Sequence, residues 1–362
     1  MKIDQNTISQ QTISKEFRLS ERERLILRSI VHNYILSAEP VGSRTLSRRY
    51  RIGLSPATVR NTMADLEDMG LLTHPHTSAG RIPTDLGYRI YVNDLMQVED
   101  VSDEVRRTLE ENLVSFSPET NEIFERVSEL LSEVSRMLAV IIAPDLSSGE
   151  LDRVEIIRVA SGRVMVIVVV RSGLVRTILL EMNAEITDPE IADAVQLINQ
   201  RLSGLRLSEI HHEISKRLSD SRSSRNAIVR LLLDFPEKIF GTLSNKEMHI
   251  GSTRPLLEQP EYRSSDKMKG IIELIEDRDI IVHLLKDRTQ GVTVTIGQEH
   301  HGERLKDLSV ITSTYRMGDE LGTLGIIGPK RMNYSRLMAL VDYTARIVSS
   351  RVANAKYNPS NS

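Results

Sequence analysis

The segment LSPATVRNTMADLEDMGLLTHPHTSAGRIPT (residues 54–84) decides the fold of the N-terminal part of this 362-residue chain. Ser55 is a good N-cap, because its hydroxyl accepts a hydrogen bond from a backbone N–H that the helix leaves free, and Pro56 suits the first helical position. Gly70 suits the left-handed residue that ends a helix. The apolar residues between them repeat with the helical period and predict a buried stripe: Val59, Met63, Leu66 and then Met69 or Gly70.

The opposite face of this predicted helix carries small or hydrogen-bonding side chains, namely Ala57, Thr58, Arg60, Asn61 and Ala64. Such a face lets the backbone enter a major groove, where Arg60 and Asn61 can reach guanine, adenine or phosphate. Residues 71–73 predict a strand, 74–80 a turn and 81–83 a short return strand. A helix followed by a β-hairpin indicates a winged DNA-binding domain.

The residues upstream extend this pattern. Residues 20–39 predict an amphipathic helix in which Ser20 is the N-cap and Glu23 completes a capping box. Pro40 ends that helix, and a second short helix is expected over residues 43–50. Residues 40–64 contain five arginines and no acidic residue. A run of arginines is usually a solvated face, but here it occurs with the cap, the helical period and the hairpin in the order of a DNA-binding domain.

We therefore expect a DNA-binding site in this region. Phosphate contacts are expected from the basic side chains Arg44, Arg48, Arg49 and Arg81. Base contacts are expected from Thr58, Arg60 and Asn61. The expected site is completed by the helix cap and the predicted turn, that is, by Ser55, His76, Thr77 and Ser78. Two such domains held by a dimer would meet two half-sites on one face of a duplex, so affinity is expected to depend on dimer geometry.

Four blocks of the sequence resemble the HrcA family of heat-inducible transcription repressors of bacteria. They are PVGSRTL (40–46), SPATVRNTMADLEDMGLL (55–72), HPHTSAGRIPTDLGYRIYVNDL (74–95) and LGTLGIIGPKRMNYSRLMALVDYTA (321–345). The resemblance extends from about Leu19 to Arg351. It implies a negative regulator of the class I heat-shock operons, which encode the groE and dnaK chaperones. Such a regulator binds as a homodimer to double-stranded DNA at the inverted-repeat operator CIRCE, is released on heat stress, and is maintained in its active form by the GroEL chaperonin.

The resemblance also implies an α+β multidomain fold: an N-terminal winged helix-turn-helix, then a GAF-like α+β domain with an inserted, mainly helical dimerisation domain. The expected boundaries are a disordered tail at 1–18, the winged-helix domain at 19–98, linker helices and the first part of the GAF-like domain at 99–182, the inserted domain at 183–259, the second part of the GAF-like domain at 260–353, and a disordered tail at 354–362. The polar, acidic residues 97–104 are expected to form a hinge.

Two groups of β-branched runs support the α+β assignment. Runs from Arg153 to residue 182 predict adjacent hairpins, and the runs DIIVHLL (279–285), VTVTIGQE, LSVITSTYRM and LGTLGIIG predict later strands of the same sheet. Residues 183–259 between them look largely helical. Before the first group, the side chains at 124, 127, 131, 134 and 138 step by 3, 4, 3 and 4. This stripe fits either a coiled-coil seam between two chains or packing on the chain's own sheet.

No catalytic, cofactor-binding or metal site is expected. Gly322, Gly325 and Gly328 are not followed by the lysine and hydroxyl residue of a phosphate-binding loop. His74 and His76 have no nearby cysteine or third histidine to complete a metal shell. The chain has no cysteine, its net charge is −3, and no apolar run suits a membrane span. Residues 1–98 hold 13 Lys and Arg and 10 Asp and Glu, a balance of +3, which leaves −6 for the rest.

The expected protein is therefore a cytoplasmic DNA-binding regulator and not an enzyme. Two alternatives stay open at this point. One is a metabolite-sensing winged-helix regulator that uses a pocket in the GAF-like domain, although a fold alone does not establish a function. The other is a partner-binding scaffold with residual DNA affinity, which would bind DNA in a salt-sensitive but sequence-indifferent way.

Overall fold

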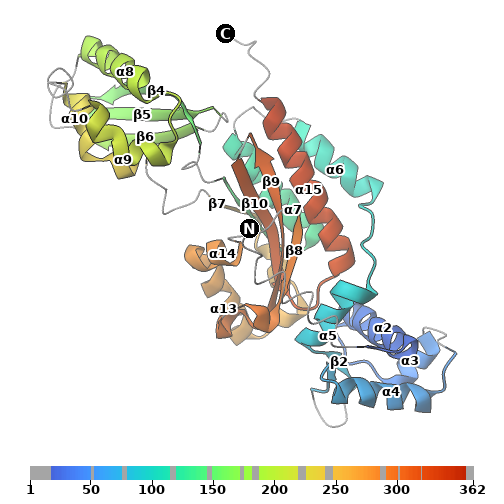
Figure 1. The fold of residues 1–362 in the computed structure, drawn as a ribbon. Helices are drawn as coiled ribbons and strands as arrows, with labels where there is room; N and C mark the ends of the chain where they lie inside the picture. The colour runs from blue at the N-terminus through green and yellow to red at the C-terminus, as the bar shows by residue number, and fades with distance from the viewer. Residues whose placement is uncertain are drawn as a thin grey trace.

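A computed structural model describes residues 18–49, 53–75, 80–114, 120–144, 149–171, 175–181, 187–218, 226–240, 248–285, 291–300, 302–318 and 320–355. The tails expected at 1–18 and 354–362 lie almost wholly outside these residues. Figure 1 shows three bodies: an N-terminal unit (18–96), a central unit built on a long sheet (103–144 and 248–355), and a satellite unit with a smaller sheet (149–240). Among the described residues, no helix is both long and apolar enough to cross a membrane.

The N-terminal unit consists of helices followed by a short hairpin. Its elements are α2 (Glu21–Ser37), α3 (Ser43–Arg49), α4 (Pro56–Asp68), β1 (Leu72–Thr73), β2 (Ile82–Pro83), α5 (Asp85–Ile90) and a π-helical turn, η1 (Tyr91–Leu95). The capping box predicted at Ser20 and Glu23 is present, since each residue's backbone N–H donates to the other's side chain. The helix ends at Ser37, two residues before the predicted end, because Ala38 adopts a left-handed conformation with φ of 56°.

The central unit contains a five-stranded antiparallel sheet with the order β7-β3-β10-β9-β8. The strands are β3 (Leu138–Ile142), β7 (Met248–Ile250), β8 (Val292–Ile296), β9 (Leu308–Met317) and β10 (Glu320–Pro329). Its helices are α6 (Asp103–Val114), α7 (Thr120–Ser135), α12 (Arg254–Leu257), α13 (Ser265–Glu276), α14 (Arg278–Leu285) and α15 (Tyr334–Ala355), with short 3-10 turns η4 (Pro260–Tyr262), η5 (Gly297–Glu299) and η6 (Glu303–Leu305). α7 and α15 pack on the sheet, and α6 packs on α7.

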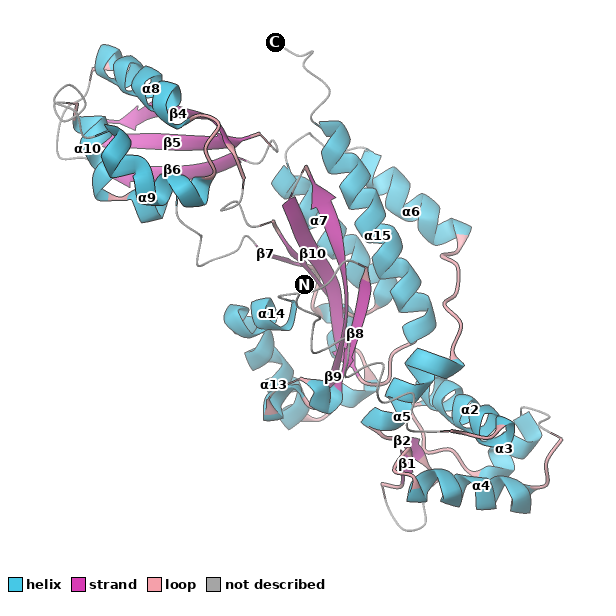
Figure 2. Cartoon of the chain, in the orientation of Figure 1, coloured by secondary structure: helices cyan, strands magenta, loops and turns pink. Residues whose placement is uncertain are grey.

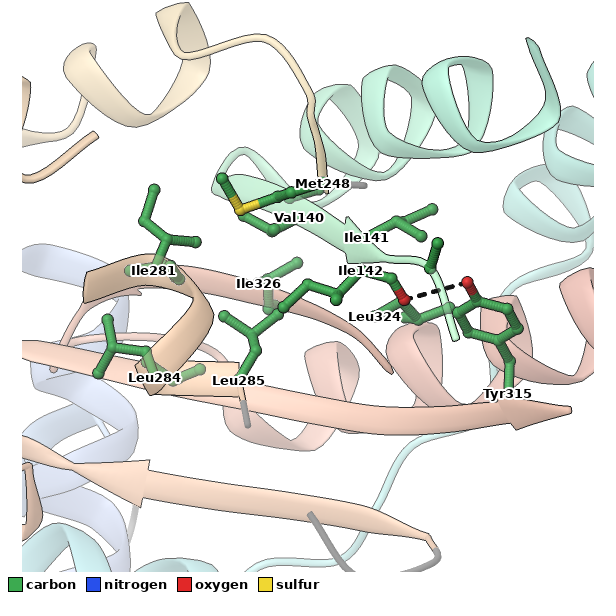
Figure 3. Packing of buried hydrophobic residues seen from close by; sticks show 14 of the residues in the cluster. Val140, Ile141, Ile142, Met248, Ile281, Leu284, Leu285, Tyr315, Leu324 and Ile326 are labelled. Atoms are coloured by element: carbon green, nitrogen blue, oxygen red, sulfur yellow. Dashed lines mark hydrogen bonds between the residues drawn. The ribbon is translucent and has the colours of Figure 1, made fainter. Parts of the chain in front are cut away.

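One part of the core of the central unit lies where α14 meets the sheet. Figure 3 shows apolar side chains of β3 and β10, including Val140 and Ile326, beside Ile281 and Leu285 of α14. Residues 279–285 were expected to be a strand, and this expectation is wrong. A short apolar run does not distinguish a strand from a buried helix, and here it forms a helix with one face on β9 and β10.

The apolar stripe of residues 124–138 packs within the chain. Phe124, Val127 and Leu131 of α7 are fully buried, and α7 contacts β3, β7 and α15. The helix ends at Ser135, so Leu138 belongs to β3 instead of the helical stripe. Of the two interpretations left open by the sequence, the structure supports packing on the chain's own sheet.

The satellite unit has its own three-stranded antiparallel sheet, with the order β4-β5-β6. Its elements are β4 (Leu151–Ala160), β5 (Arg163–Val170), β6 (Val175–Glu181), α8 (Asp188–Leu202), α9 (Leu207–Leu218), α10 (Ala227–Asp234) and α11 (Pro236–Phe240). The sequence analysis placed residues 151–181 in one sheet with the later strands, and the strand order corrects this. Because α8 packs on β4 and the other satellite helices pack on α8 and α9, the inserted unit begins near residue 149 and not at 183.

Candidate nucleic-acid interface

Helix α4 lies at the outer edge of the N-terminal unit, on the side away from the central sheet (Figure 2). Its start is fixed as predicted: Ser55 Oγ accepts a hydrogen bond from the Thr58 N–H at 3.1 Å, and Pro56 begins the helix. Val59, Met63 and Leu66 are buried as expected. The predicted stripe then differs in its last residues.

The buried stripe of α4 does not reach Met69 or Gly70. Met69 follows the last helical residue, and 37% of its surface is exposed, while Gly70 has φ of 74° and is also exposed. Thr62 is buried in addition to the predicted residues, and its hydroxyl donates to the Thr58 carbonyl oxygen at 3.1 Å. A threonine whose hydroxyl is satisfied within its own helix can face a core at little cost.

The outward face of α4 presents the side chains expected to read bases. Arg60 and Asn61 are exposed, with the small residues Ala57 and Ala64 on the same exposed side. Thr58 is half-buried, and its hydroxyl lies 2.9 Å from Ser55 Oγ. Arg60 and Asn61 are therefore free to reach a partner, whereas Thr58 is engaged with the helix cap.

Helix α3 adds basic side chains beside α4. The two helices pack together, and Ser47 Oγ donates to the Leu54 carbonyl oxygen at 3.1 Å, which joins α3 to the start of α4. Arg44 and Arg48 are exposed, and neither has a carboxylate within 4.0 Å in the part of the chain that the structure describes. The same holds for Arg60. Arg49 is the last residue of α3, and its side chain lies outside the described ones.

The hairpin after α4 is present as a two-residue ladder, in which Leu72 pairs with Pro83 and Thr73 with Ile82. His76, Thr77 and Ser78 of the expected site lie outside the described residues. Thr84 Oγ1 donates to the Gly70 carbonyl oxygen at 2.7 Å and ties the return strand to the end of α4. The base of the hairpin is thus fixed against the helix that it follows.

Arg81 differs from the other predicted phosphate contacts because it already has a carboxylate partner. Its Nη2 lies 2.6 Å from Glu67 Oε2, and the other Glu67 oxygen contacts His74 Nδ1. Burial acts to raise the pKa of Glu67, but the hydrogen bond from His74 and the charge of Arg81 outweigh it, so the pKa is lower than usual. Glu67 was not predicted to take part, because its partners come seven and fourteen residues later in an irregular segment.

The opposite side of the N-terminal unit is docked on the central unit through an ion pair between a buried arginine and a glutamate whose side chain is one-third exposed. Arg89 of α5 is 3% exposed, and its guanidinium binds both oxygens of Glu299, at 2.7 Å from Nε to Oε1. Arg89 Nη2 also donates to the Val294 carbonyl oxygen at 2.8 Å. A bidentate arginine–carboxylate pair fixes orientation as well as distance.

Further contacts surround that pair. Lys330 Nζ lies 2.6 Å from one oxygen of Asp85, and the Gln298 N–H donates to the other at 2.9 Å. Arg331 pairs with Glu261 at 2.6 Å and donates to the Ile35 carbonyl oxygen at 2.5 Å. The N-terminal unit is therefore held at several points, and not by its chain connection alone.

The expected hinge is partly immobilised by these surroundings. Ser335 Oγ donates to the Gln97 carbonyl oxygen, and the Glu99 N–H donates to Ser335 Oγ at 3.1 Å. The non-helical connection spans residues 96–102, because α6 already begins at Asp103. Residues 97–102 of the expected hinge therefore run along the start of α15, and residues 103–104 belong to α6.

Comparison with known proteins identifies the family. Residues 121–338 match the family described as HrcA protein C terminal domain. A heat-inducible transcription repressor HrcA from Chlorobium phaeobacteroides (strain BS1) is 38% identical over 340 residues, which cover 90% of this chain and 96% of that protein. The chain belongs to the HrcA family. HrcA proteins are heat-inducible transcription repressors and not enzymes, as the sequence analysis expected.

Other relatives and a solved structure agree with this assignment. The HrcA repressor of Desulfitobacterium hafniense (strain DSM 10664 / DCB-2) is 34% identical over 350 residues, covering 94% of this chain and all of that protein. A crystal structure described as that of a hypothetical protein matches 93% of this chain and 100% of that chain with a TM-score of 0.60 and 22% identity, which supports the fold. As an HrcA protein, the chain acts in transcription through DNA, and the mixed α and antiparallel β architecture is confirmed.

Proposed function

We propose that this HrcA protein represses the groE and dnaK chaperone operons by binding as a dimer to the CIRCE inverted repeat, and that heat stress releases it. The observation that carries the proposal is the outward face of α4, where Arg60 and Asn61 are exposed beside Arg44 and Arg48, and where the three arginines have no carboxylate partner among the described residues. Free basic and amide groups on an exposed helix suit a duplex.

In this proposal the N-terminal unit is a winged helix-turn-helix in which α3 and α4 form the helix pair and β1 and β2 the wing. Arg44, Arg48 and Arg49 contact phosphates, and Arg60 and Asn61 read base edges. Ser55 and Thr58 support the start of α4, and His76, Thr77 and Ser78 continue the contacts along the wing. Arg81 reaches a phosphate only where its ion pair with Glu67 opens. The central unit is the GAF-like domain, and its role is to hold the winged unit through the Arg89 and Asp85 contacts.

Dimerisation is proposed through the satellite sheet, because the helices that the structure describes cover only one of its faces. On the other face, Ile157, Val159, Val175 and Leu179 are each 46–55% exposed. Ile157 and Leu179 flank Met165 in one cross-strand row. Contiguous exposed apolar surface marks an interface. Ion pairs such as Arg163 with Glu181, 2.8 Å apart, border the face. Because each pair supplies one positive and one negative charge, two copies related by a two-fold axis can meet without like-charge contact.

A charged substitution on this face tests the dimer. Leu179→Glu is expected to shift the protein from dimer to monomer in sedimentation equilibrium, because it places an unpaired carboxylate in an apolar interface. Ile272→Glu on α13 is the matched control, since Ile272 is 40% exposed but lies on another unit. A dimer that persists in Leu179→Glu, or that is lost equally in both variants, contradicts the proposed interface.

DNA footprinting tests the operator. The unaltered protein is expected to protect both half-sites of a CIRCE-type duplex symmetrically and to bind a duplex with scrambled half-sites more weakly. Leu179→Glu, as a monomer, is expected to lose affinity for the paired half-sites while retaining weak binding to each one. Absence of symmetric protection at any salt concentration would contradict the operator assignment.

The role of GroEL is proposed from the family resemblance, and it has a direct test. Titration of purified protein with GroEL at growth temperature is expected to raise the fraction of molecules that bind the operator. Heating is expected to lower that fraction. When the contacts between the N-terminal and central units loosen, one N-terminal unit of the dimer no longer fits its half-site, although the units themselves are still folded. A DNA-competent fraction that GroEL leaves unchanged counts against this part of the proposal.

A second candidate function is ligand-controlled regulation, and a cavity favours it. A cleft of about 730 Å³ lies between the N-terminal and central units, a volume typical of small-molecule sites. Tyr88 and Tyr262 line it, are 2% and 6% exposed, and have hydroxyls without a hydrogen-bond partner among the described residues. The sequence analysis placed such a pocket within the GAF-like domain, whereas this cleft lies at its border with the winged unit.

A thermal-shift screen with metabolites separates this candidate from the first. A ligand of the cleft is expected to raise the melting temperature, because it binds the folded state alone, and Tyr262→Phe is expected to reduce the shift. If no compound raises the melting temperature, or if the shift is equal in Tyr262→Phe, the cleft is not a ligand site.

A further inference from the structure

The base of the hairpin contains a cluster of charged and polar side chains from three elements. Glu67 comes from the last turn of α4, His74 follows β1, and Arg81 precedes β2. The Glu67 carboxylate contacts both of the others, at 2.6 Å for Arg81 Nη2. The Arg81 side chain is 26% exposed and that of His74 is 40% exposed, so both stay accessible from outside. One carboxylate thus holds two groups that also suit a phosphate.

The backbone at this place is held without the Glu67 carboxylate. Val41 and Arg81 exchange two backbone hydrogen bonds of 2.9 Å, and β1 pairs with β2. At Gly80, a Cβ atom would lie 2.5 Å from the backbone carbon of Val41, so only glycine permits this approach of the two segments. Because the main chain is fixed by these contacts, the carboxylate chiefly determines the charge of the cluster and not its fold.

The Glu67 carboxylate lies at the boundary of the basic surface. Residues 40–64 contain arginines and no acid, and Glu67 lies one turn of α4 beyond Met63. The Glu67 carboxylate is ionised at neutral pH, since its pKa lies below the ordinary value of 4.5. Arg81 is consequently neutralised by a group of the same chain, while Arg44, Arg48 and Arg60 have no carboxylate partner within the described ranges. Carboxylate and phosphate oxygens accept hydrogen bonds from guanidinium in the same two-pronged geometry.

We propose that Glu67 is an intramolecular competitor for DNA phosphate, which withholds Arg81 and His74 from sequence-independent contact with the duplex backbone. The proposal rests on the proposed DNA-binding function and deepens it. Phosphate contacts supply most of non-specific affinity, so a withheld arginine lowers binding to random DNA. The ratio of operator to random affinity then depends more on Arg60 and Asn61, which are free in the same unit.

Glu67→Gln tests the proposal, because glutamine keeps an oxygen that can accept from Arg81 and His74 but removes the charge. Freeing one arginine for phosphate should make the slope of log K against log salt steeper by about 0.9. The ratio of the Glu67→Gln affinity to that of the unaltered protein for a random duplex then falls roughly threefold as the salt concentration rises from about 50 to 200 mM. Asp68→Asn is the matched control: it removes the same charge from the next residue, which is exposed and has no ion pair within the described residues.

The expected result is tighter random-duplex binding and a steeper slope in Glu67→Gln, neither of which occurs in Asp68→Asn, and a reversal of both when Arg81→Ala is added. Glu67→Asp, which is shorter and keeps the charge, should change the slope in the same direction and covers the case in which Glu67→Gln does not fold. If Glu67→Gln behaves as Asp68→Asn does, or binds both duplexes more weakly than the unaltered protein, the proposal is overturned. If instead the unaltered protein shows no salt-dependent DNA binding, the proposed function itself fails.

Discussion

The two sides of the N-terminal unit carry the same kinds of charged residue in opposite states. On the outward side, Arg44, Arg48 and Arg60 are exposed and have no carboxylate partner among the described residues. On the inward side, Arg89 is buried and Asp85 half-buried, and each binds an oppositely charged residue of the central unit. The outward arginines are hydrated and have no ion pair among the described residues, whereas Arg89 is desolvated and paired within the chain.

This difference indicates how the two sides contribute to function. A buried arginine that lost its partner would be strongly destabilising, so the inward side fixes where the N-terminal unit sits. An exposed arginine contributes little to stability and keeps its hydrogen-bonding capacity for the proposed DNA contacts. Stability and binding should therefore respond to substitutions on different sides, and the experiments below test that separation.

The largest effect is expected from Arg89→Ala. It leaves the Glu299 carboxylate, which is one-third exposed, and the Val294 carbonyl oxygen without their partner, and the lost hydrogen bonds should lower the free energy of unfolding or undocking by about 2–3 kcal/mol. Urea unfolding, with proteolysis of residues 97–102 as a probe of undocking, measures it. Arg44→Ala is the control and should stay within about 0.5 kcal/mol of the unaltered protein. Equal stability of the two variants would contradict the division between the sides.

The next effect concerns sequence discrimination. Arg60→Ala and Asn61→Ala are each expected to reduce the preference for the operator over random DNA by about 1–3 kcal/mol, the value of one bidentate base contact. Competition gel shifts measure it, with Arg107→Ala on α6 as a control at an exposed arginine far from α4. Operator preference that survives the double variant would show that another face reads the bases.

A smaller effect is expected from Arg48→Ala. Loss of one phosphate contact should weaken operator and random DNA alike and flatten the slope of log K against log salt by about 0.9. Binding titrations at four or more salt concentrations measure it. A change confined to the operator would instead place Arg48 among the base-reading residues.

The smallest effect is the pH dependence of the hairpin cluster. The pKa of Glu67 in the folded protein lies below its ordinary value of 4.5. Its contribution to stability is therefore complete above that ordinary value and is lost as the pH falls through the lowered pKa. The melting-temperature difference between the unaltered protein and Glu67→Gln should be present near pH 6 and vanish in strong acid. A difference that is unchanged over this range would show that the carboxylate's ionisation does not stabilise the hairpin.

Local features of the fold were predictable from the sequence because their causes are local. The Ser20–Glu23 box, the Ser55 cap and the buried stripe of α4 each involve residues within a few positions of one another. Exposure of Arg60 and Asn61 follows from the same helical period. The last turn of α4 was predicted wrongly, because the period alone does not show that the helix ends before Met69.

Features that depend on distant residues were not predictable. Lys330 pairs with Asp85 and Arg89 with Glu299, more than two hundred residues apart, and no local pattern marks such partners. The sheet to which a strand belongs is equally hard to predict. The sequences of β4 to β6 indicate strands, but they do not show that these strands form a sheet of their own. The helix α14 shows that a short apolar run needs its tertiary neighbours to determine its conformation.

The attachment of the satellite unit has a practical consequence. The chain leaves the central sheet at the end of β3 and returns on β7, and Ile142 stands directly opposite Met248. Facing Cα atoms of antiparallel strands are about 4.5–5.5 Å apart, a gap that a tight turn can bridge. The segment between these two residues can therefore be exchanged as a whole. A variant in which a short turn replaces it should still fold into the N-terminal and central units. A variant that carries a chemically induced dimerisation domain in its place should make the proposed repression depend on the inducing compound.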